Sequence, residues 1–169
     1  MNIFFLSQDP VESAQLMCDK HVAGKMAVES AQMLSTAHRI LDGHLLTPEQ
    51  DSLLYKITHK NHPCSMWVRD SADNYLWLYR HFIALCDEYT LRYNKIHLSD
   101  TKFREMLKRP PANIPDIGPT DPPLAMPDEY KKTCPIDSYR EYYIKEKHMK
   151  KNIVAYKNTP VPQFLSEYM

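Results

Sequence analysis

The sequence CDKHVAGKMAVESAQMLSTAHR, residues 18–39, combines the spacing of an amphipathic helix with a line of chemically capable side chains. A straight α-helix turns by about 100° per residue, which places six polar side chains within roughly 80° of one another. These six residues are His21, Lys25, Glu29, Gln32, Thr36 and Arg39. The adjoining face is apolar and contains Val22, Met26, Met33, Ala37 and Ile40. The pattern predicts a long helix whose polar face is either ordinarily solvated or carries a site.

Residues on either side indicate where this helical region begins and ends. Asp9 followed by Pro10 is typical of a helix start, because Asp caps the first turn and Pro suits its first position. The pattern runs to about Leu41, and Asp42-Gly43 ends it. We expect a break or kink within residues 19–24, and an extended apolar lead at residues 2–6 that packs against the body.

A second long helical segment is predicted from about Cys64 to Asn94, rich in aromatic residues, with a break at Ser71. Shorter helices are predicted at residues 48–57 and 99–109. Seven prolines in residues 110–127 exclude a helix there, so residues 110–135 should form an extended wrap or loop. A final helix is predicted over residues 137–150, within an aromatic and basic C-terminal segment, residues 137–169.

These elements predict a mostly α protein. We expect a single compact helical domain over residues 1–169, with two long helices, the proline-rich extended segment and a C-terminal helix. Only three glycines are present, which disfavours a phosphate-binding glycine-rich loop and an all-β architecture.

Charge and cysteine content limit the functional classes. The chain has 21 basic and 21 acidic residues and a formal net charge of zero, so any binding of nucleic acid depends on a local patch. Four widely spaced cysteines form no CxxC pair, and the first residues are too few for a secretory or membrane segment. We therefore expect reduced thiols, no membrane association and a cytoplasmic protein, in the host cytoplasm if a phage encodes it.

Two further clusters contain candidate binding residues. HKNHPCSMWVRDS, residues 59–71, places His62 and Arg69 near a helix N-terminus that offers free N–H groups to an anion, although a simple capping turn has the same sequence features. SYREYYIKEKHMKK, residues 138–151, interleaves Tyr142 and Tyr143 with cations that can hold phosphates while the rings stack on bases. Tyrosines packed on the core with solvated lysines would give the same pattern.

Metal binding has weak support in the sequence. Cys18, His21, His59, His62 and Cys64 are potential ligands, but no pair has the spacing of a structural zinc site. We expect no metal and no cofactor.

Four stretches give the chain a resemblance to the phage pyrimidine-dimer DNA glycosylase (endonuclease V-type) family. CDKHVAGKMAVE resembles the family's first helix, with one inserted residue, and NHPCSMW followed by NYLWLYRHFIALCDEYTLR is similar to the start of its second long helix. AMPDEYKKTCP resembles a stretch before the last section of these enzymes, and SYREYYIKEK resembles the C-terminal segment that they place against DNA. NHPCSMW is the most specific of the four.

The resemblance implies a definite chemistry. A terminal α-amine attacks C1′ of the damaged nucleotide, the base leaves, an imine forms and elimination cuts the strand. It assigns the catalytic carboxylate to Glu29 and a substrate contact to His21. The family's nucleophile is a small residue exposed by removal of the initiator Met, but residue 2 here is the bulky Asn2. We therefore expect Met1 to be retained and to carry the amine, with Lys25 or Lys20 as a substitute.

The favoured interpretation is a DNA glycosylase, with or without AP-lyase activity, that acts on a damaged or modified base in duplex DNA. Its predicted catalytic residues are Met1, Lys25 and Glu29, and its predicted substrate-binding residues are His21, Arg39, His62, Arg69, Tyr142 and Tyr143. Two alternatives remain open at this point. One is an enzyme on a small nucleotide, with or without a metal, on the same scaffold; the other is a non-catalytic phage protein that binds a host or phage protein.

Overall fold

The computed structural model describes residues 1–149, 155–166 and 168. Every regular element in these residues is helical, which confirms the mostly α prediction. In chain order the elements are α1 (Pro10–Gln15), the π-helix η1 (His21–Lys25), α2 (Met26–Asp42), the 3-10 helix η2 (Gly43–Leu45), α3 (Pro48–Leu53), α4 (Pro63–Asp70), α5 (Ala72–Tyr93), α6 (Leu98–Phe103), the 3-10 helix η3 (Asp128–Tyr130), α7 (Pro135–Tyr142), the π-helix η4 (Tyr143–Met149) and α8 (Gln163–Ser166).

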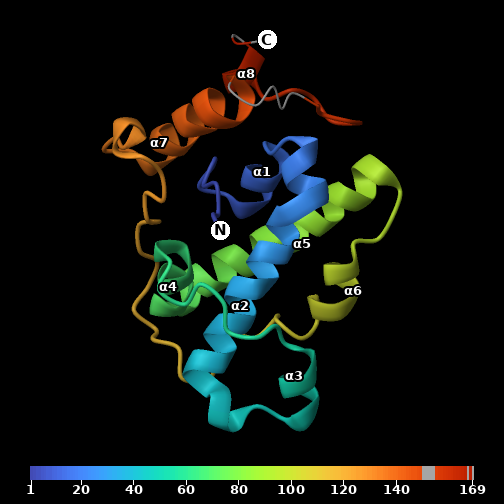
Figure 1. Cartoon of the computed structure of the whole chain (residues 1–169), viewed down its shortest axis with the longest axis vertical. Helices are drawn as coiled ribbons and strands as arrows, with labels where there is room; N and C mark the ends of the chain where they lie inside the picture. The colour runs from blue at the N-terminus through green and yellow to red at the C-terminus, as the bar shows by residue number, and fades with distance from the viewer. Residues whose placement is uncertain (150–154, 167, 169) are drawn as a thin grey trace.

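The two long helices, α2 and α5, pack against each other and form the centre of the molecule (Figure 1). Helices α1 and α4 also contact α5, and α4 contacts α2. The shared core is built from aliphatic, methionine and aromatic side chains, among them Met26, Leu34, Tyr75, Leu78 and Phe82. Burial of such side chains contributes roughly 1.5–3 kcal/mol each, so this packing is the main stabilising term.

The helix starts follow the capping residues of the sequence. The Asp9 carboxylate accepts hydrogen bonds from the N–H groups of Val11 and Glu12, with Pro10 at the first helical position. Ser71 is extended and its Oγ accepts from the Asp73 N–H, which ends α4 and starts α5. The predicted break at Ser71 is therefore confirmed.

Several predicted boundaries differ from the structure. Helix α3 ends four residues before the predicted end at residue 57, because the chain turns extended at Leu54 and buries that side chain. Helix α6 ends at Phe103 rather than near residue 109 and continues only as turns. The predicted final helix consists of α7 and η4 up to Met149, and residue 150 lies outside the described residues. The short helix α8 was not predicted from the proline-containing tail.

A fully buried guanidinium holds the connection between α1 and α2. Arg92, on α5, donates to the carbonyl oxygen of Gln15 (3.1 Å), the last residue of α1, and to that of Met17 (2.7 Å) in the connection. It also pairs with Asp19 at 3.1 Å and with Glu88 at 2.8 Å. The predicted break in residues 19–24 lies directly after these contacts, where the π-helix η1 begins. Arg92 thus fixes the point from which the chain enters α2.

The proline-rich segment runs as an extended chain along the side of α4, from the end of α2 to α7, as expected (Figure 1). Helical residues satisfy its backbone polar groups. Asp42 accepts from the N–H groups of Ala112 and Asn113, and the Thr120 N–H donates to Asn74 Oδ1 at 3.0 Å. The segment is therefore fixed to the helices at several points, because its backbone groups find partners outside regular structure.

His81 gives the fold a specific pH dependence. It is fully buried, its Nδ1 donates to the Pro10 carbonyl at 2.9 Å, and burial lowers the pKa of His81 to about 4. The unfolded state then binds more protons than the folded state between pH 6.5 and 4, so the free energy of unfolding falls as the pH falls through this range. We expect His81 to contribute a loss of about 2 kcal/mol between pH 7 and 5, measured by urea unfolding.

The matched variant is His81→Asn, whose side-chain amide can still donate to Pro10 but does not titrate in this range. It should be less stable than the wild type at pH 7 and should show a shallower decline towards pH 5. Equal slopes for the two proteins would contradict the assignment of this pH dependence to His81.

Candidate active site

The N-terminal residues, η1, the start of α2 and the junction of α7 with η4 line a cavity of about 450 Å³. Five of the predicted site residues meet there: Met1, His21, Lys25, Glu29 and Tyr142. The cavity also contains Asn2, Phe4, Lys20 and Lys147. In Figure 1 the N-terminus lies between α4 and α7, beside the upper part of α2. Residues from both ends of the sequence thus form one concave site.

The carboxylate of Glu29 approaches the N-terminus closely. Its Oε2 atom lies 3.7 Å from the Met1 amine nitrogen. The same atom accepts a hydrogen bond of 3.1 Å from the Asn2 N–H. The Glu29 side chain retains 20% of its exposure, so solvent or a ligand can reach it. A carboxylate beside an amine can take and return protons when the amine reacts with an electrophilic carbon.

The π-helix η1 aligns the residues of this site. The Met26 N–H donates to the His21 carbonyl, a hydrogen bond five residues back along the chain. In a straight α-helix, the eight residue steps from His21 to Glu29 would leave these two side chains roughly 80° apart around the helix axis. A π turn absorbs one residue, which reduces this angle to about 20° and brings both side chains to one face.

His21 is held from behind by Tyr143. The Tyr143 hydroxyl lies 2.7 Å from His21 Nδ1 and accepts a 2.9 Å hydrogen bond from the Cys18 N–H. Tyr143 is only 1% exposed, and burial raises its pKa well above the ordinary value, so it stays protonated. Although the sequence suggested that it contacts substrate, Tyr143 lies behind the cavity and orients His21.

Stacked rings form one wall of the cavity. The ring of Phe4 stacks on His21 at 4.8 Å and on Tyr142 at 6.1 Å. Phe4 has a φ of 44°, a left-handed conformation that is strained for a residue with a bulky side chain. Lys147 Nζ lies over the rings of Tyr142 (5.0 Å) and Phe4 (5.7 Å), an arrangement that favours a cation. This wall presents aromatic faces beside positive charge.

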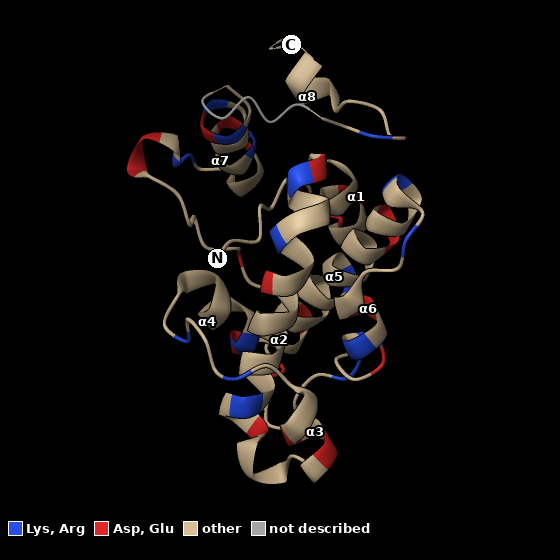
Figure 2. Cartoon of the chain, turned by 45° about the vertical axis from the view of Figure 1, so that its right-hand side comes forward, with Lys and Arg blue, Asp and Glu red and all other residues tan. Residues whose placement is uncertain are grey.

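Positive charge predominates in this cavity. Lys20, Lys25 and Lys147 line it together with the terminal amine, whereas Glu29 is the one acidic residue among the described residues that line it. Figure 2 shows basic residues on α7 and on the helical segment that leads into α2, on the two sides of the extended N-terminal segment. An anionic ligand such as a phosphate is therefore favoured here.

Two predicted residues lie on α4, outside the residues that line this cavity. His62 caps α4, and its Nδ1 accepts from the Cys64 N–H at 3.2 Å. Burial lowers the pKa of His62, the positive N-terminus and His59 lower it further, and Glu29 raises it, so His62 is electrostatically coupled to the site. Arg69 donates to the Ser65 carbonyl at 3.0 Å on its own helix.

Arg39 lies further along α2 and joins this helix to the loop around α3. Its guanidinium donates to the carbonyl oxygens of Tyr55 (2.6 Å) and Leu54 (2.9 Å) and pairs with Asp51. These contacts occupy the guanidinium, and Arg39 does not line the cavity.

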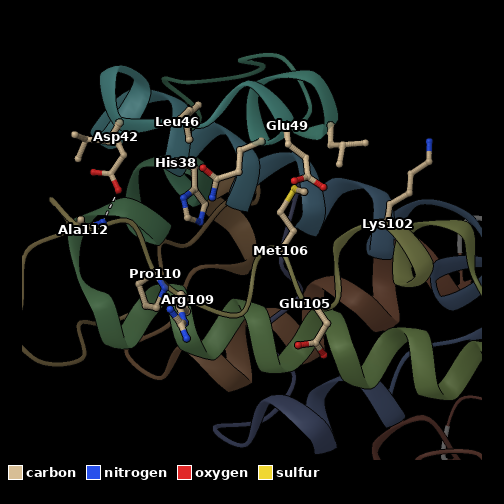
Figure 3. A pocket seen from close by; sticks show the side chains of 13 residues that line it. His38, Asp42, Leu46, Glu49, Lys102, Glu105, Met106, Arg109, Pro110 and Ala112 are labelled. Atoms are coloured by element: carbon tan, nitrogen blue, oxygen red, sulfur yellow. Dashed lines mark hydrogen bonds between the residues drawn. The ribbon is translucent and has the colours of Figure 1, made fainter.

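A second cavity, of about 680 Å³, lies at the far end of α2 between α3 and the turns that follow α6 (Figure 3). Its two most buried polar residues already have partners: His38 Nε2 lies 2.9 Å from the Tyr75 hydroxyl, and Asp42 accepts from the Ala112 and Asn113 N–H groups. His38 and Asp42 therefore have structural roles, and the candidate active site remains the cavity at the N-terminus.

Sequence reasoning missed three residues of the candidate site. The sequence marks Asn2 only as a bulky residue that retains Met1, and Phe4 only as part of an apolar lead. Lys147 was one of several cations in the C-terminal stretch, and the interleaved aromatic and basic pattern was the signal that could have singled it out.

The fold and site together define an all-helical protein, over the described residues, with an amine and a carboxylate in a positively charged, aromatic cavity. The pyrimidine dimer DNA glycosylase family matches residues 1–101, more than half of the chain, and the chain belongs to this family. The match includes Met1, His21, Lys25 and Glu29, whereas Tyr142 and Lys147 lie beyond it. No curated protein and no solved structure matches the chain.

Neither a metal cluster nor a membrane span is found in residues 1–149, 155–166 and 168. No group of three or more His, Cys, Asp or Glu residues in this part of the chain is arranged to hold a metal ion. None of its helices combines the length and apolarity needed to cross a bilayer.

The role of the Tyr143 hydroxyl can be tested with Tyr143→Phe. This change leaves the buried Cys18 N–H without its acceptor and removes the 2.7 Å contact to His21 Nδ1. We expect the free energy of unfolding to fall by about 1–3 kcal/mol in urea denaturation. Tyr142→Phe is the matched control, since Tyr142 is half-buried and its ring faces the cavity, and we expect it to change stability by less than about 0.5 kcal/mol. Equal effects would contradict this assignment.

Proposed function

We propose that this protein is a DNA glycosylase with AP-lyase activity that acts on pyrimidine dimers in duplex DNA. The family supports the glycosylase and its substrate class. The observation that carries the proposal is the approach of the Met1 amine to Glu29, 3.7 Å apart in a positively charged cavity. This pair supplies the two groups that imine chemistry on a sugar requires.

In the proposed reaction the neutral Met1 amine attacks C1′ of the damaged nucleotide. The C1′–N bond to the base breaks, and the base departs with the bonding electron pair and is protonated. The amine nitrogen then loses a proton, the C1′–O4′ bond breaks and O4′ takes up a proton, which opens the sugar and leaves a protonated imine at C1′. Removal of a C2′ proton then expels the 3′ phosphate, and water releases the enzyme from the cleaved product. Glu29 is the group proposed to move these protons and to stabilise the cationic intermediates.

The remaining residues are proposed to bind and orient the DNA. Lys25 and His21 flank Glu29, and Tyr142 offers an aromatic face on which an extruded base can stack. His62 and Arg69, at α4, are proposed to contact the duplex next to the cavity. Arg39 and Tyr143 are proposed to act through the structure, because their polar groups are occupied by protein partners.

Borohydride trapping tests this proposal. The wild type is incubated with duplexes that contain a thymine dimer or an abasic site, and the imine is reduced to a covalent adduct. We expect an adduct whose peptide map places the DNA on the Met1 amine. Glu29→Gln, which keeps the size but not the charge, should reduce the trapping rate by about 100-fold or more. Glu49→Gln, an exposed change on α3, is the matched control and should trap at the wild-type rate.

The outcomes separate the parts of the proposal. An adduct on Lys25 or on the α-amine of Asn2 would replace Met1 as the nucleophile, and base release without an adduct would leave a glycosylase without lyase activity. No base release, strand cleavage or adduct on any of these duplexes would contradict the proposed function.

Lys147 is expected to contribute to DNA affinity through a phosphate contact. Lys147→Gln should weaken binding to all duplexes by a similar factor and reduce the slope of log K against log salt by about 1, measured by fluorescence anisotropy. Lys102→Gln, beside the second cavity, is the matched control and should leave the slope unchanged. Equal slopes for wild type and Lys147→Gln would contradict the phosphate contact.

A further inference from the structure

We propose that Asn2 is a positioning residue that keeps the reactive Met1 amine beside Glu29 because its side chain is hydrogen-bonded to the proline-rich segment. The inference rests on the proposed function, because it concerns the amine proposed as nucleophile. It also gives the proline-rich segment a role next to the site, as the backbone to which the N-terminal segment is hydrogen-bonded.

Asn2 uses its backbone and both ends of its side chain. Its N–H donates to Glu29 Oε2 at 3.1 Å. Its side-chain Nδ2 donates to the Ala125 carbonyl at 2.8 Å, and its Oδ1 accepts from the Phe4 N–H at 2.9 Å. Three hydrogen bonds thus hold this residue between α2, the proline-rich segment and Phe4, two residues further along the N-terminal segment.

This arrangement leaves the Met1 amine little freedom. Three covalent bonds separate the amine nitrogen from the Asn2 nitrogen, so with Asn2 fixed the amine moves mainly by rotation about the Met1 Cα–C bond. The Met1 side chain is only 2% exposed, and such a rotation would pull it out of its packing. The distance of 3.7 Å between amine and Glu29 is therefore a consequence of the Asn2 contacts and the buried Met1 side chain.

The part of the proline-rich segment that binds Asn2 is itself restrained by hydrogen bonds. The Tyr139 hydroxyl donates to the Pro123 carbonyl at 2.6 Å, and the Ala125 N–H donates to the same carbonyl at 2.9 Å. Neighbouring prolines restrict the backbone of this segment. On the other side, the Asn2 Oδ1 bond supports Phe4 in its strained conformation at φ 44°, which aims the Phe4 ring at His21.

The chemistry of the side chain explains why Asn suits residue 2. A donor for Ala125 and an acceptor for Phe4 must lie on one short side chain, and the Asn amide supplies both. Asp can accept from Phe4 but cannot donate to a carbonyl when it is ionised, and Leu has a similar shape without either function. Both substitutes are bulky, so Met1 should be retained in each variant, which mass spectrometry of the intact protein verifies.

The test compares Asn2→Leu and Asn2→Asp with the wild type in single-turnover borohydride trapping at saturating duplex, together with the Kd for the same duplex. We expect the trapping rate of Asn2→Leu to fall by about 100-fold while Kd changes by less than about twofold, because the amine is misplaced but the DNA-binding surface is intact. Asn2→Asp keeps the Phe4 bond and should fall by about 10-fold or more. Asn113→Leu, which alters the other end of the proline-rich segment at Asp42, should trap at the wild-type rate.

Amide hydrogen exchange at Phe4 supplies a readout that needs no activity, since its N–H is bonded to Asn2 Oδ1. We expect faster exchange at Phe4 in Asn2→Leu than in the wild type. Wild-type trapping rates in both Asn2 variants would overturn the inference, and so would an effect confined to Kd. If the wild type itself traps no duplex, the proposed function fails. In that case, unchanged amide exchange at Phe4 in Asn2→Leu would independently contradict the inference that Asn2 fixes the N-terminal segment.

Discussion

The buried guanidinium of Arg92 is the constraint on which the position of the site depends. It is removed from water, so the free energy lost on desolvation must be recovered from its partners, and it has two carboxylates and two carbonyl oxygens around it. The carbonyls belong to Gln15, at the end of α1, and to Met17, four residues before η1 begins at His21. Asp19 extends the network, because it also accepts from the Lys157 N–H at 3.1 Å and 3.0 Å. The start of η1 is therefore fixed relative to α5 and to the C-terminal segment.

From that fixed point the π turn decides which side chains reach the cavity. The sequence predicted one polar stripe on a straight helix, and His21, Lys25 and Glu29 do lie together. Further along the same stripe, the side chains have structural roles. Thr36 forms hydrogen bonds with the backbone of Thr58, and Arg39 forms hydrogen bonds with the loop around α3. Periodicity identifies the face of a helix, but it carries no information about which element covers each part of that face.

Two kinds of feature are hardest to predict from the sequence. One is a contact between residues that are far apart in the sequence, and the other is the choice of which of two neighbouring helical residues faces the cavity. Asn2 and Ala125 are 123 residues apart, and no local pattern indicates that they meet. Tyr142 and Tyr143 are neighbours with the same local composition, yet Tyr142 lines the cavity and Tyr143 is buried behind His21. Consecutive helical residues differ by about 100°, so a shift of one residue in a short helix exchanges these roles. The order of the helices and their capped starts, by contrast, are local properties that the sequence reveals directly.

A formal net charge of zero is compatible with this positive cavity, because charges act over a limited range. The Debye length at physiological ionic strength is about 8 Å, so carboxylates elsewhere on the surface contribute little to the potential at the N-terminus. Among the described residues that line the cavity, three lysines and the terminal amine accompany a single carboxylate, that of Glu29. Partial enclosure strengthens their field relative to open water, whereas the exposed pair of Lys131 with Asp128 is screened. The potential that a phosphate meets is therefore set by the few residues that η1 and η4 bring to the N-terminus.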